Sequence, residues 1–216
     1  MDDWKERRER QIKKRVTMAV IAVALVLTGI LVIVLRSGIL RREGEIVLTQ
    51  ECESYRSEVE MVAEKYGMTP YVDLIMAVMM QESGGRSLDV MQCAEGVVNT
   101  LYPHVPNGIT DPSYSIDCGI QELKYALEKV ECKNPRDIEK IKIALQGYNF
   151  GIDGFLAFLQ EKGDVRWTEE YAQEYARQAS GEVLRDASDA ETMGPWAYGD
   201  QYYPLHVLRF YKLSAQ

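Results

Sequence analysis

The apolar residues of this chain recur at the spacing of an α-helix, and no segment shows a convincing strand alternation. In residues 45–66 they step by three and four, which predicts one amphipathic helix that Gly67 ends. Residues 71–82 form a second apolar helical run, with Thr69 and Pro70 before it as the expected N-cap and first helical residue. The predicted fold class is therefore mostly α.

The rest of the chain continues this pattern between clusters of turn-forming residues. Residues 99–114 are rich in proline, asparagine and glycine and predict a loop. Ser115 and Thr168 are each expected to cap a helix, and Asn134 is expected to open another. Residues 181–199 predict a long irregular stretch before a final helix. These elements together suit a single compact helical domain.

The N-terminal part of the chain has a different character. Residues 16–35 are apolar and uncharged, and about 20 such residues cross a bilayer as a helix. Residues 1–15 are rich in lysine and arginine, so the positive-inside rule places them in the cytoplasm. A cleaved signal peptide is the competing interpretation, but its apolar core is normally shorter. We expect a cytoplasmic tail, a single-pass anchor in the cell membrane, a linker over residues 36–44 and an extracellular domain over residues 45–216.

The charge balance of the predicted outer part argues against nucleic acid as a partner. Only 4 of the 33 acidic residues but 7 of the 25 basic residues precede the apolar segment, which leaves 29 acids against 18 bases outside. Nucleic-acid binding usually requires a basic surface, so this excess of acids is a poor match.

The cysteines all lie in the predicted extracellular part, where oxidation is permitted. Structural disulfides and buried thiols are both compatible with their positions, and their spacing is not that of a zinc site. No metal or other cofactor is expected. The cysteines are Cys52, Cys93, Cys118 and Cys132.

Glu82 is the candidate residue with the clearest chemical logic. It ends the predicted helix 71–82 on the same face as apolar side chains, and Gly84 suits the position just past a helix end. Partial burial and the negative end of the helix dipole both disfavour its charged form. A carboxyl that stays protonated near neutral pH can act as the general acid in glycoside cleavage. The alternative is a glutamate that merely ends an amphipathic helix at the surface.

Two further polar motifs fit a sugar-binding cleft. Met91-Gln92 follows Glu82 by nine and ten residues. Tyr148-Asn149 stands between glycines near a predicted helix end. Singly, the first pair is usually packing and the second is usually a helix cap. A tyrosine hydroxyl, an asparagine amide and a flat aromatic face can also bind a sugar.

In order and combination, these motifs resemble the lysozyme-like superfamily of goose-type lysozymes and lytic transglycosylases. The closer resemblance is to its CwlT-like branch, the lysozyme-like domain of cell-wall hydrolases carried by Gram-positive conjugative elements. The similarity covers about residues 45–213. The residues that carry it are Gln81-Glu82-Ser83-Gly84-Gly85, Asp89-Val90-Met91-Gln92, Ser115-Ile116 before Gly119, and Gln146-Gly147-Tyr148-Asn149-Phe150-Gly151.

The resemblance implies cleavage of the β-1,4 bond between N-acetylmuramic acid (MurNAc) and N-acetylglucosamine (GlcNAc) in peptidoglycan, by hydrolysis or by transglycosylation. It also implies service to a conjugation or type IV secretion channel, with channel proteins as partners. Glu82 matches the catalytic acid of the family. The positions that match sugar binding or orientation of the acid are Ser83, Met91, Gln92, Tyr148 and Asn149.

The second catalytic carboxylate is less defined by the sequence. An inverting hydrolase needs a base to activate water, whereas a transglycosylase uses the sugar's own 6-hydroxyl. Glu95 is the expected base because it follows Met91-Gln92, and Asp89 and Asp117 are the alternatives. For each of the three, a solvated loop carboxylate is the more common case, since acidic residues are frequent at protein surfaces. A Cys93–Cys118 disulfide would brace the neighbouring loops.

Two non-enzymatic functions compete with the muramidase interpretation. One is a glycan-binding or scaffolding component of a membrane-spanning complex. A non-catalytic protein of this kind would be expected to lack the glutamate at position 82. The other is an anchored helical partner protein whose motifs serve only packing and capping. The presence of Glu82 counts against the first, and the polar pairs Glu82-Ser83 and Tyr148-Asn149 fit the second poorly.

Overall fold

The computed structural model describes residues 47–212. The expected tail, membrane anchor and linker, as well as residues 45–46 and 213–216, lie outside this range. Within it, none of the helices combines the length and the apolar character needed to cross a bilayer.

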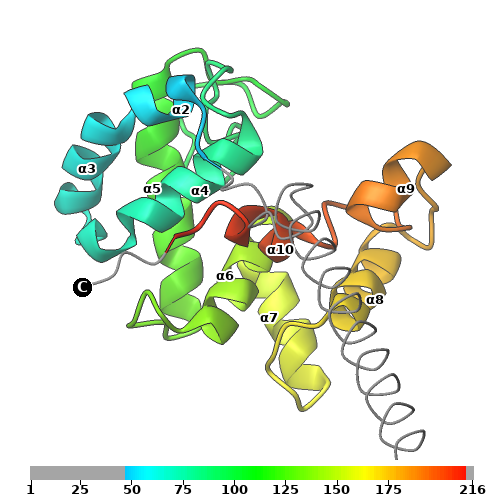
Figure 1. Ribbon diagram of the computed structural model, residues 1–216. Coiled ribbons are helices and arrows are strands. Elements are labelled where there is room, and N and C mark those ends of the chain that lie inside the picture. Colours follow the sequence, from blue (N-terminus) through cyan, green and yellow to red (C-terminus); the bar gives the residue numbers. More distant parts are fainter. Residues whose placement is uncertain (1–46, 213–216) are drawn as a thin grey trace, which may run out of the picture. The chain divides into compact units, whose positions relative to one another are not determined.

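The described residues form a mostly helical domain, as the apolar periodicity predicts (Figure 1). The only β pairing among them is one isolated antiparallel bridge between Leu184 and Trp196. The helices, in chain order, are α2 (Gln50–Ser54), α3 (Arg56–Lys65), the 3-10 helix η1 (Thr69–Tyr71), α4 (Val72–Glu82), α5 (Pro112–Lys129), α6 (Ile138–Phe150), α7 (Ile152–Glu161), α8 (Glu169–Ala179), α9 (Ala187–Met193) and α10 (Tyr203–Leu208).

Buried residues of α4, α5 and α6 belong to one core; α5 packs on α6, and the short helix α10 packs against both α4 and α6 (Figure 1). Leu74, Ile120 and Leu145, one from each of the three long helices, are fully buried. Burial of an aliphatic side chain of this size contributes about 1.5–3 kcal/mol. The core thereby holds the end of α4 and the start of α10 in fixed positions.

The predicted helix 45–66 is two helices in its described part. Thr49 caps α2 by accepting from the Cys52 N–H at 3.1 Å, and the chain then breaks at Tyr55. The Thr49 hydroxyl also donates to the Gly84 carbonyl at 2.6 Å. This contact with the turn after α4 sets the position of α2. The apolar pattern could not predict the contact, because Thr49 and Gly84 are far apart in the sequence.

Three predicted helix starts are also displaced. Thr69 lies inside η1 and makes no side-chain cap. Asp111, rather than Ser115, caps α5 by accepting from the Ser113 N–H at 3.0 Å. Asp137, rather than Asn134, caps α6. Ser115 lies inside α5 and donates to Asp89, whereas Asn134 accepts from the Arg136 N–H in a local turn.

Two later predictions have different outcomes. Thr168 caps α8 as expected, accepting from the Tyr171 N–H at 3.0 Å. The stretch 181–199 is not wholly irregular, because α9 lies within it.

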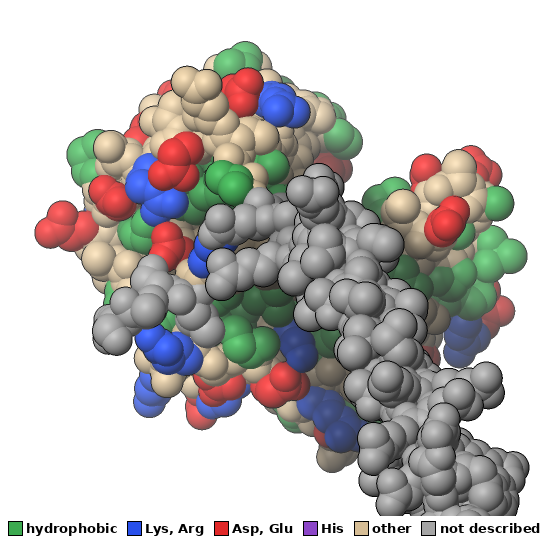
Figure 2. All heavy atoms as spheres, viewed as in Figure 1, with side chains coloured by type: hydrophobic (Ala, Val, Ile, Leu, Met, Phe, Trp, Pro, Cys, Tyr) green, Lys and Arg blue, Asp and Glu red, His purple; other side chains and the backbone are tan. Residues whose placement is uncertain are grey.

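Ion pairs on the surface join neighbouring elements. Arg56 lies between Glu53 and Asp73 and joins α3 to both α2 and α4. Figure 2 shows acidic and basic side chains interspersed over the visible face rather than separated into fields of one sign. Exposed pairs of this kind contribute about 0–1 kcal/mol each, so they add little to the stability of the domain.

Candidate active site

Glu82 is the last residue of α4, whose central residues are all buried. The chain then turns sharply through Gly84 and Gly85, which have φ of +62° and +76°. A Cβ on Gly85 would lie 2.5 Å from the backbone nitrogen of Cys52, so only glycine fits against the start of α2. The turn therefore packs directly against the start of α2.

The Glu82 carboxyl is half-buried and accepts one hydrogen bond. The Tyr203 hydroxyl, at the start of α10, donates to Glu82 Oε1. Burial raises the pKa of Glu82 to about 7, with Asp89 and Asp200 adding to the rise and the Tyr203 hydrogen bond opposing it. The carboxyl therefore exchanges its proton in the neutral range, as a general acid must.

A cleft of about 1200 Å³ opens beside Glu82. Five of the seven site residues predicted from the sequence line it: Glu82, Gln92, Glu95, Tyr148 and Asn149. The other aromatic side chains on its walls are tyrosines, apart from Phe150, and flat faces of this kind suit sugar rings. A smaller groove of about 700 Å³ over α3 and the start of α4 contains none of the predicted site residues.

Tyr148 and Asn149 form the part of the wall that α6 supplies. The Tyr148 ring stacks on that of Tyr203 with centroids 6.3 Å apart, and its hydroxyl donates to the Met91 carbonyl at 2.8 Å. The Asn149 side-chain oxygen accepts from the Asp200 N–H at 2.7 Å. Both side chains therefore brace the cleft as well as face it.

Ser83 and Met91 are not among the lining residues of the cleft. The Ser83 hydroxyl donates to the Val90 carbonyl at 2.8 Å and accepts from the Gly85 N–H at 3.0 Å, so it organises the turn after α4. Met91 is fully buried against Gly119 of α5. Their contacts support the cleft from behind.

Gln92 lines the cleft and has a φ of +49°, in the left-handed region. Its amide nitrogen donates to the Asp89 carbonyl and to Asn107 Oδ1, both at 2.8 Å. These bonds hold the loop after Asp89 against the loop around Asn107. The same nitrogen lies 3.3 Å from the Ser87 hydroxyl, so the side chain has three intramolecular partners.

The three candidates for a second carboxylate have different surroundings. Asp89 is fully buried and accepts from the Ser115 hydroxyl at 2.7 Å and from the Cys93 and Ala94 N–H groups, so it anchors a loop. Asp117 receives Lys65 Nζ at 2.6 Å and lies outside the lining of the cleft. Glu95 is exposed and lines the cleft.

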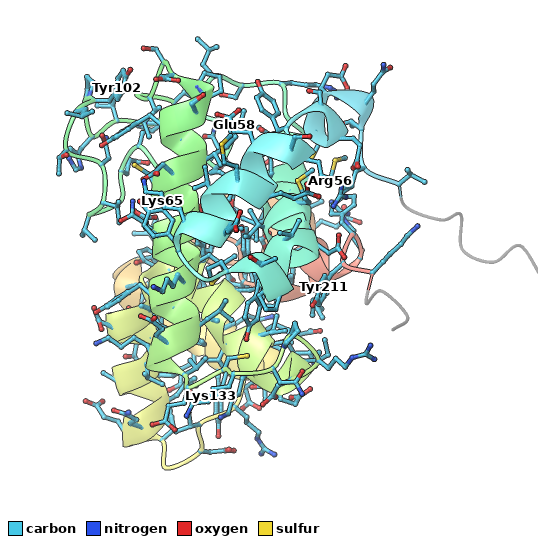
Figure 3. The ribbon with its side chains drawn as sticks, turned by 90° about the vertical axis from the view of Figure 1, so that its left-hand side faces the viewer. Arg56, Glu58, Lys65, Tyr102, Lys133 and Tyr211 are labelled. Atoms are coloured by element: carbon cyan, nitrogen blue, oxygen red, sulfur yellow. The ribbon has the colours of Figure 1, made fainter. Side chains whose placement is uncertain are left out.

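Asp117 pairs with Lys65 of α3, which is labelled in Figure 3. Lys65 stands at the end of α3 that lies beside α5, where Asp117 is located. The Tyr66 hydroxyl donates to the same carboxylate at 2.8 Å. Asp117 therefore ties α3 to α5.

Glu122 on α5 is a cleft residue that the sequence analysis missed. Burial raises its pKa to about 7, Asp89 adds to the rise, and the Val98 backbone N–H opposes it. Its position seven residues after Ser115, on the same face of a helix, was the available signal. Tyr203 was missed as well, because its partner Glu82 is far away in the sequence.

All four cysteines are free and buried, which agrees with the buried-thiol alternative. Cys93 and Cys118 lie next to each other, and the hydrogen bond between their thiols lowers the pKa of Cys118 and raises that of Cys93. In the described part of the chain, no three side chains from histidine, cysteine, aspartate and glutamate are grouped to hold a metal ion.

The chain belongs to the lysozyme-like family: the family model described as Lysozyme-like matches residues 49–207, which include the whole cleft. Among curated relatives, it is 35% identical over 167 residues to the bifunctional muramidase/DL-endopeptidase CwlT of Bacillus subtilis. That match covers 77% of this chain and 44% of CwlT, so this chain spans less than half the length of that relative.

Two other proteins extend the comparison. The chain is 30% identical to the uncharacterized membrane protein YocA of Bacillus subtilis, over 76% of this chain and 70% of YocA. A crystal structure of a Staphylococcus aureus protein described as similar to lipoprotein, NLP/P60 family, superposes with a TM-score of 0.65 at 27% identity. It covers 79% of this chain and 55% of that protein.

Proposed function

We propose that this protein cleaves peptidoglycan glycan strands at the β-1,4 bond between MurNAc and GlcNAc, with Glu82 as the acid that protonates the departing oxygen. The observation that carries the proposal is the Glu82 carboxyl, which lines the cleft and has its pKa raised to about 7 by burial. A carboxyl of this kind is the first requirement of glycoside cleavage. The similarity to CwlT, named a muramidase, supports the same reaction.

The cleft also supports a glycan as the substrate. Tyr66, Tyr125, Tyr175 and Tyr198 add aromatic faces to the polar groups of Gln92 and Asn149 along its walls. Sugars bind through this combination of stacking and directional hydrogen bonds. For the second carboxylate, the sequence prediction is Glu95, and it stays a prediction.

Mass spectrometry of purified peptidoglycan digested by the full chain in detergent tests the proposal. Wild type should release glycan fragments, and Glu82→Gln should release none, because an amide of the same shape has no carboxyl proton to give. Glu139→Gln is the matched control, since Glu139 is an exposed carboxylate on α6 that pairs with Lys142 and lies outside the lining of the cleft. A folded wild type that binds glycan without releasing products would favour the glycan-binding or scaffolding alternative.

We also propose that residues 16–35 anchor the protein in the cell membrane, with the N-terminus in the cytoplasm and the catalytic domain outside. The 20-residue apolar segment and its basic flank support this topology. YocA, a relative, is named a membrane protein. Protease added to intact protoplasts should remove the lysozyme-like domain and leave the N-terminal tail protected; protection of the domain would contradict the topology.

We propose in addition that the enzyme opens the wall for a conjugation or secretion channel. A linker over residues 36–44 spans at most about 30 Å, so an anchored enzyme would reach only glycan close to the membrane. Such confinement would spare the rest of the wall from lysis. Cells that express the domain without its anchor should lyse more than cells with the anchored form, and equal lysis would count against confinement.

A further inference from the structure

One face of α5 contacts the segment 89–98 in register. Ser115 donates to Asp89, Cys118 contacts Cys93, and Glu122 lies against Gly96. These α5 positions are three and four residues apart, the spacing of neighbours on one helix face. Glu122 is therefore held in place by the same packing that fixes Asp89.

The Glu122 carboxyl is enclosed by this segment. A Cβ on Gly96 would lie 1.6 Å from Glu122 Oε1, so the carboxyl packs directly on the Gly96 backbone. Oε1 is buried and finds no hydrogen-bond donor among the described residues. A buried carboxyl oxygen without a donor is costly and needs an explanation, which an active-site role supplies.

Glu122 and Glu82 line the same cleft from different helices. Burial raises the pKa of the Tyr148 hydroxyl most, and Cys93, Glu82, Tyr203 and Glu122 add to the rise, so Tyr148 lies near both carboxyls. Each carboxyl is half-buried, whereas Glu95 is exposed to solvent. The cleft thus has two enclosed carboxyls of matched character on its walls.

We propose that Glu122 is the catalytic base that activates water when the protein cleaves glycan by hydrolysis. The inference rests on the proposed function and adds its second catalytic group. A carboxylate that is shielded on one side and open to a cleft on the other is suited to take a proton from a bound water.

The step is balanced without any further reagent. Glu82 gives its proton to the glycosidic oxygen as the bond from that oxygen to C1 of MurNAc breaks. The water oxygen attacks C1 and releases a proton to the Glu122 carboxylate. The products are a reducing MurNAc end and a free hydroxyl on GlcNAc, and solvent then returns both carboxyls to their starting forms.

The surroundings of Glu122 support a base that works near neutral pH, since its pKa is raised to about 7. Because Glu82 must be protonated and Glu122 ionised, hydrolysis should peak close to pH 7 and fall on both sides. The titratable groups coupled to Glu122 are Asp89, Cys93, Cys118 and Tyr148.

The test compares wild type with Glu122→Gln and Glu122→Ala on purified peptidoglycan, using the full chain in detergent. Glu122→Gln should lose at least about 100-fold in the release of reducing MurNAc ends, and the acidic limb of the wild-type pH profile should disappear with it. In Glu122→Ala, sodium azide should restore cleavage and yield an azide at C1 with inverted configuration. A side chain with only a structural role would not give that product.

The outcomes separate this inference from the proposed function. A wild type without products would defeat both. If cleavage depends on Glu82 but is unchanged in Glu122→Gln, the inference about Glu122 fails and the proposed function stands. The same holds if Glu95→Gln loses hydrolysis and Glu122→Gln does not. A folded Glu122→Ala protein that is inactive and gives no azide product would also overturn it, and circular dichroism with thermal melting establishes folding.

Discussion

The Tyr203 hydroxyl donates a hydrogen bond to Glu82 Oε1 across 121 positions of sequence, joining the end of α4 to the start of α10. Tyr203 is 2% exposed, and its ring stacks on Tyr148 of α6. Three helices therefore meet at the proposed acid. The hydrogen bond stabilises the carboxylate, while burial of the same group favours the protonated form.

Replacing Tyr203 with phenylalanine should raise the pKa of Glu82. The substitution removes a donor to the charged form and keeps the burial that disfavours it. The alkaline limb of the pH–activity profile should move to higher pH, and carbon-13 NMR titration of the Glu82 carboxyl should show the same direction. A shift to lower pH would contradict the described balance. Tyr202→Phe, which changes the neighbouring tyrosine, is the matched control.

Stability should fall as the pH rises from about 4.5 to about 7. The pKa values of Glu82 and Glu122 are higher in the folded protein than in the unfolded chain. Both groups therefore stabilise the fold at pH values below their pKa in the unfolded chain, and this contribution is lost as the pH rises and they ionise. Glu122→Gln, which cannot ionise, should be more stable than wild type by about 1–2 kcal/mol at pH 8 and nearly equal at pH 4.5. Urea unfolding at the two pH values measures the difference. An equal effect at both would show that ionisation of Glu122 is not the cause.

Gly119→Ala should destabilise the domain by about 1–3 kcal/mol, since overpacking a core has costs of that order. A new Cβ would lie 2.5 Å from Met91 Cβ, in a fully buried contact. Helix propensity alone predicts the opposite sign, a gain of about 1 kcal/mol. Thermal unfolding of Gly119→Ala and wild type shows which of the two effects is larger. Glu128→Ala, at an exposed position of the same helix, should change stability by less than about 0.5 kcal/mol.

Asp89→Ala should cost about 2–4 kcal/mol of stability. The substitution leaves the buried Ser115 hydroxyl and the Cys93 and Ala94 N–H groups without their acceptor. Asp89→Asn, which keeps one acceptor oxygen, should lose less. Urea unfolding of the three proteins measures the order, and equal stability of wild type and Asp89→Ala would contradict an anchoring role.

Local signals predicted the environment of Glu82 well. The apolar face of α4 forecast partial burial, and burial is the first cause of the raised pKa. Gly84 ends the helix turn with positive φ, as its lack of a Cβ predicts. The same is true of Thr168, whose capping bond involves only its own helix. These properties depend on near neighbours, which a sequence pattern records.

The apolar period and the order of polar motifs thus determined a helical, lysozyme-like chain with an acid at position 82. Only the tertiary structure shows that Glu122 lines the cleft with Glu82 whereas Asp89 and Asp117 do not, because these three carboxyls look alike as sequence. Asp89 is buried under Ser115, Asp117 pairs with Lys65, and Glu122 is enclosed at Gly96. The physical reason is that burial and hydrogen-bond partners set the chemistry of a carboxyl, and segments far apart in the chain supply both.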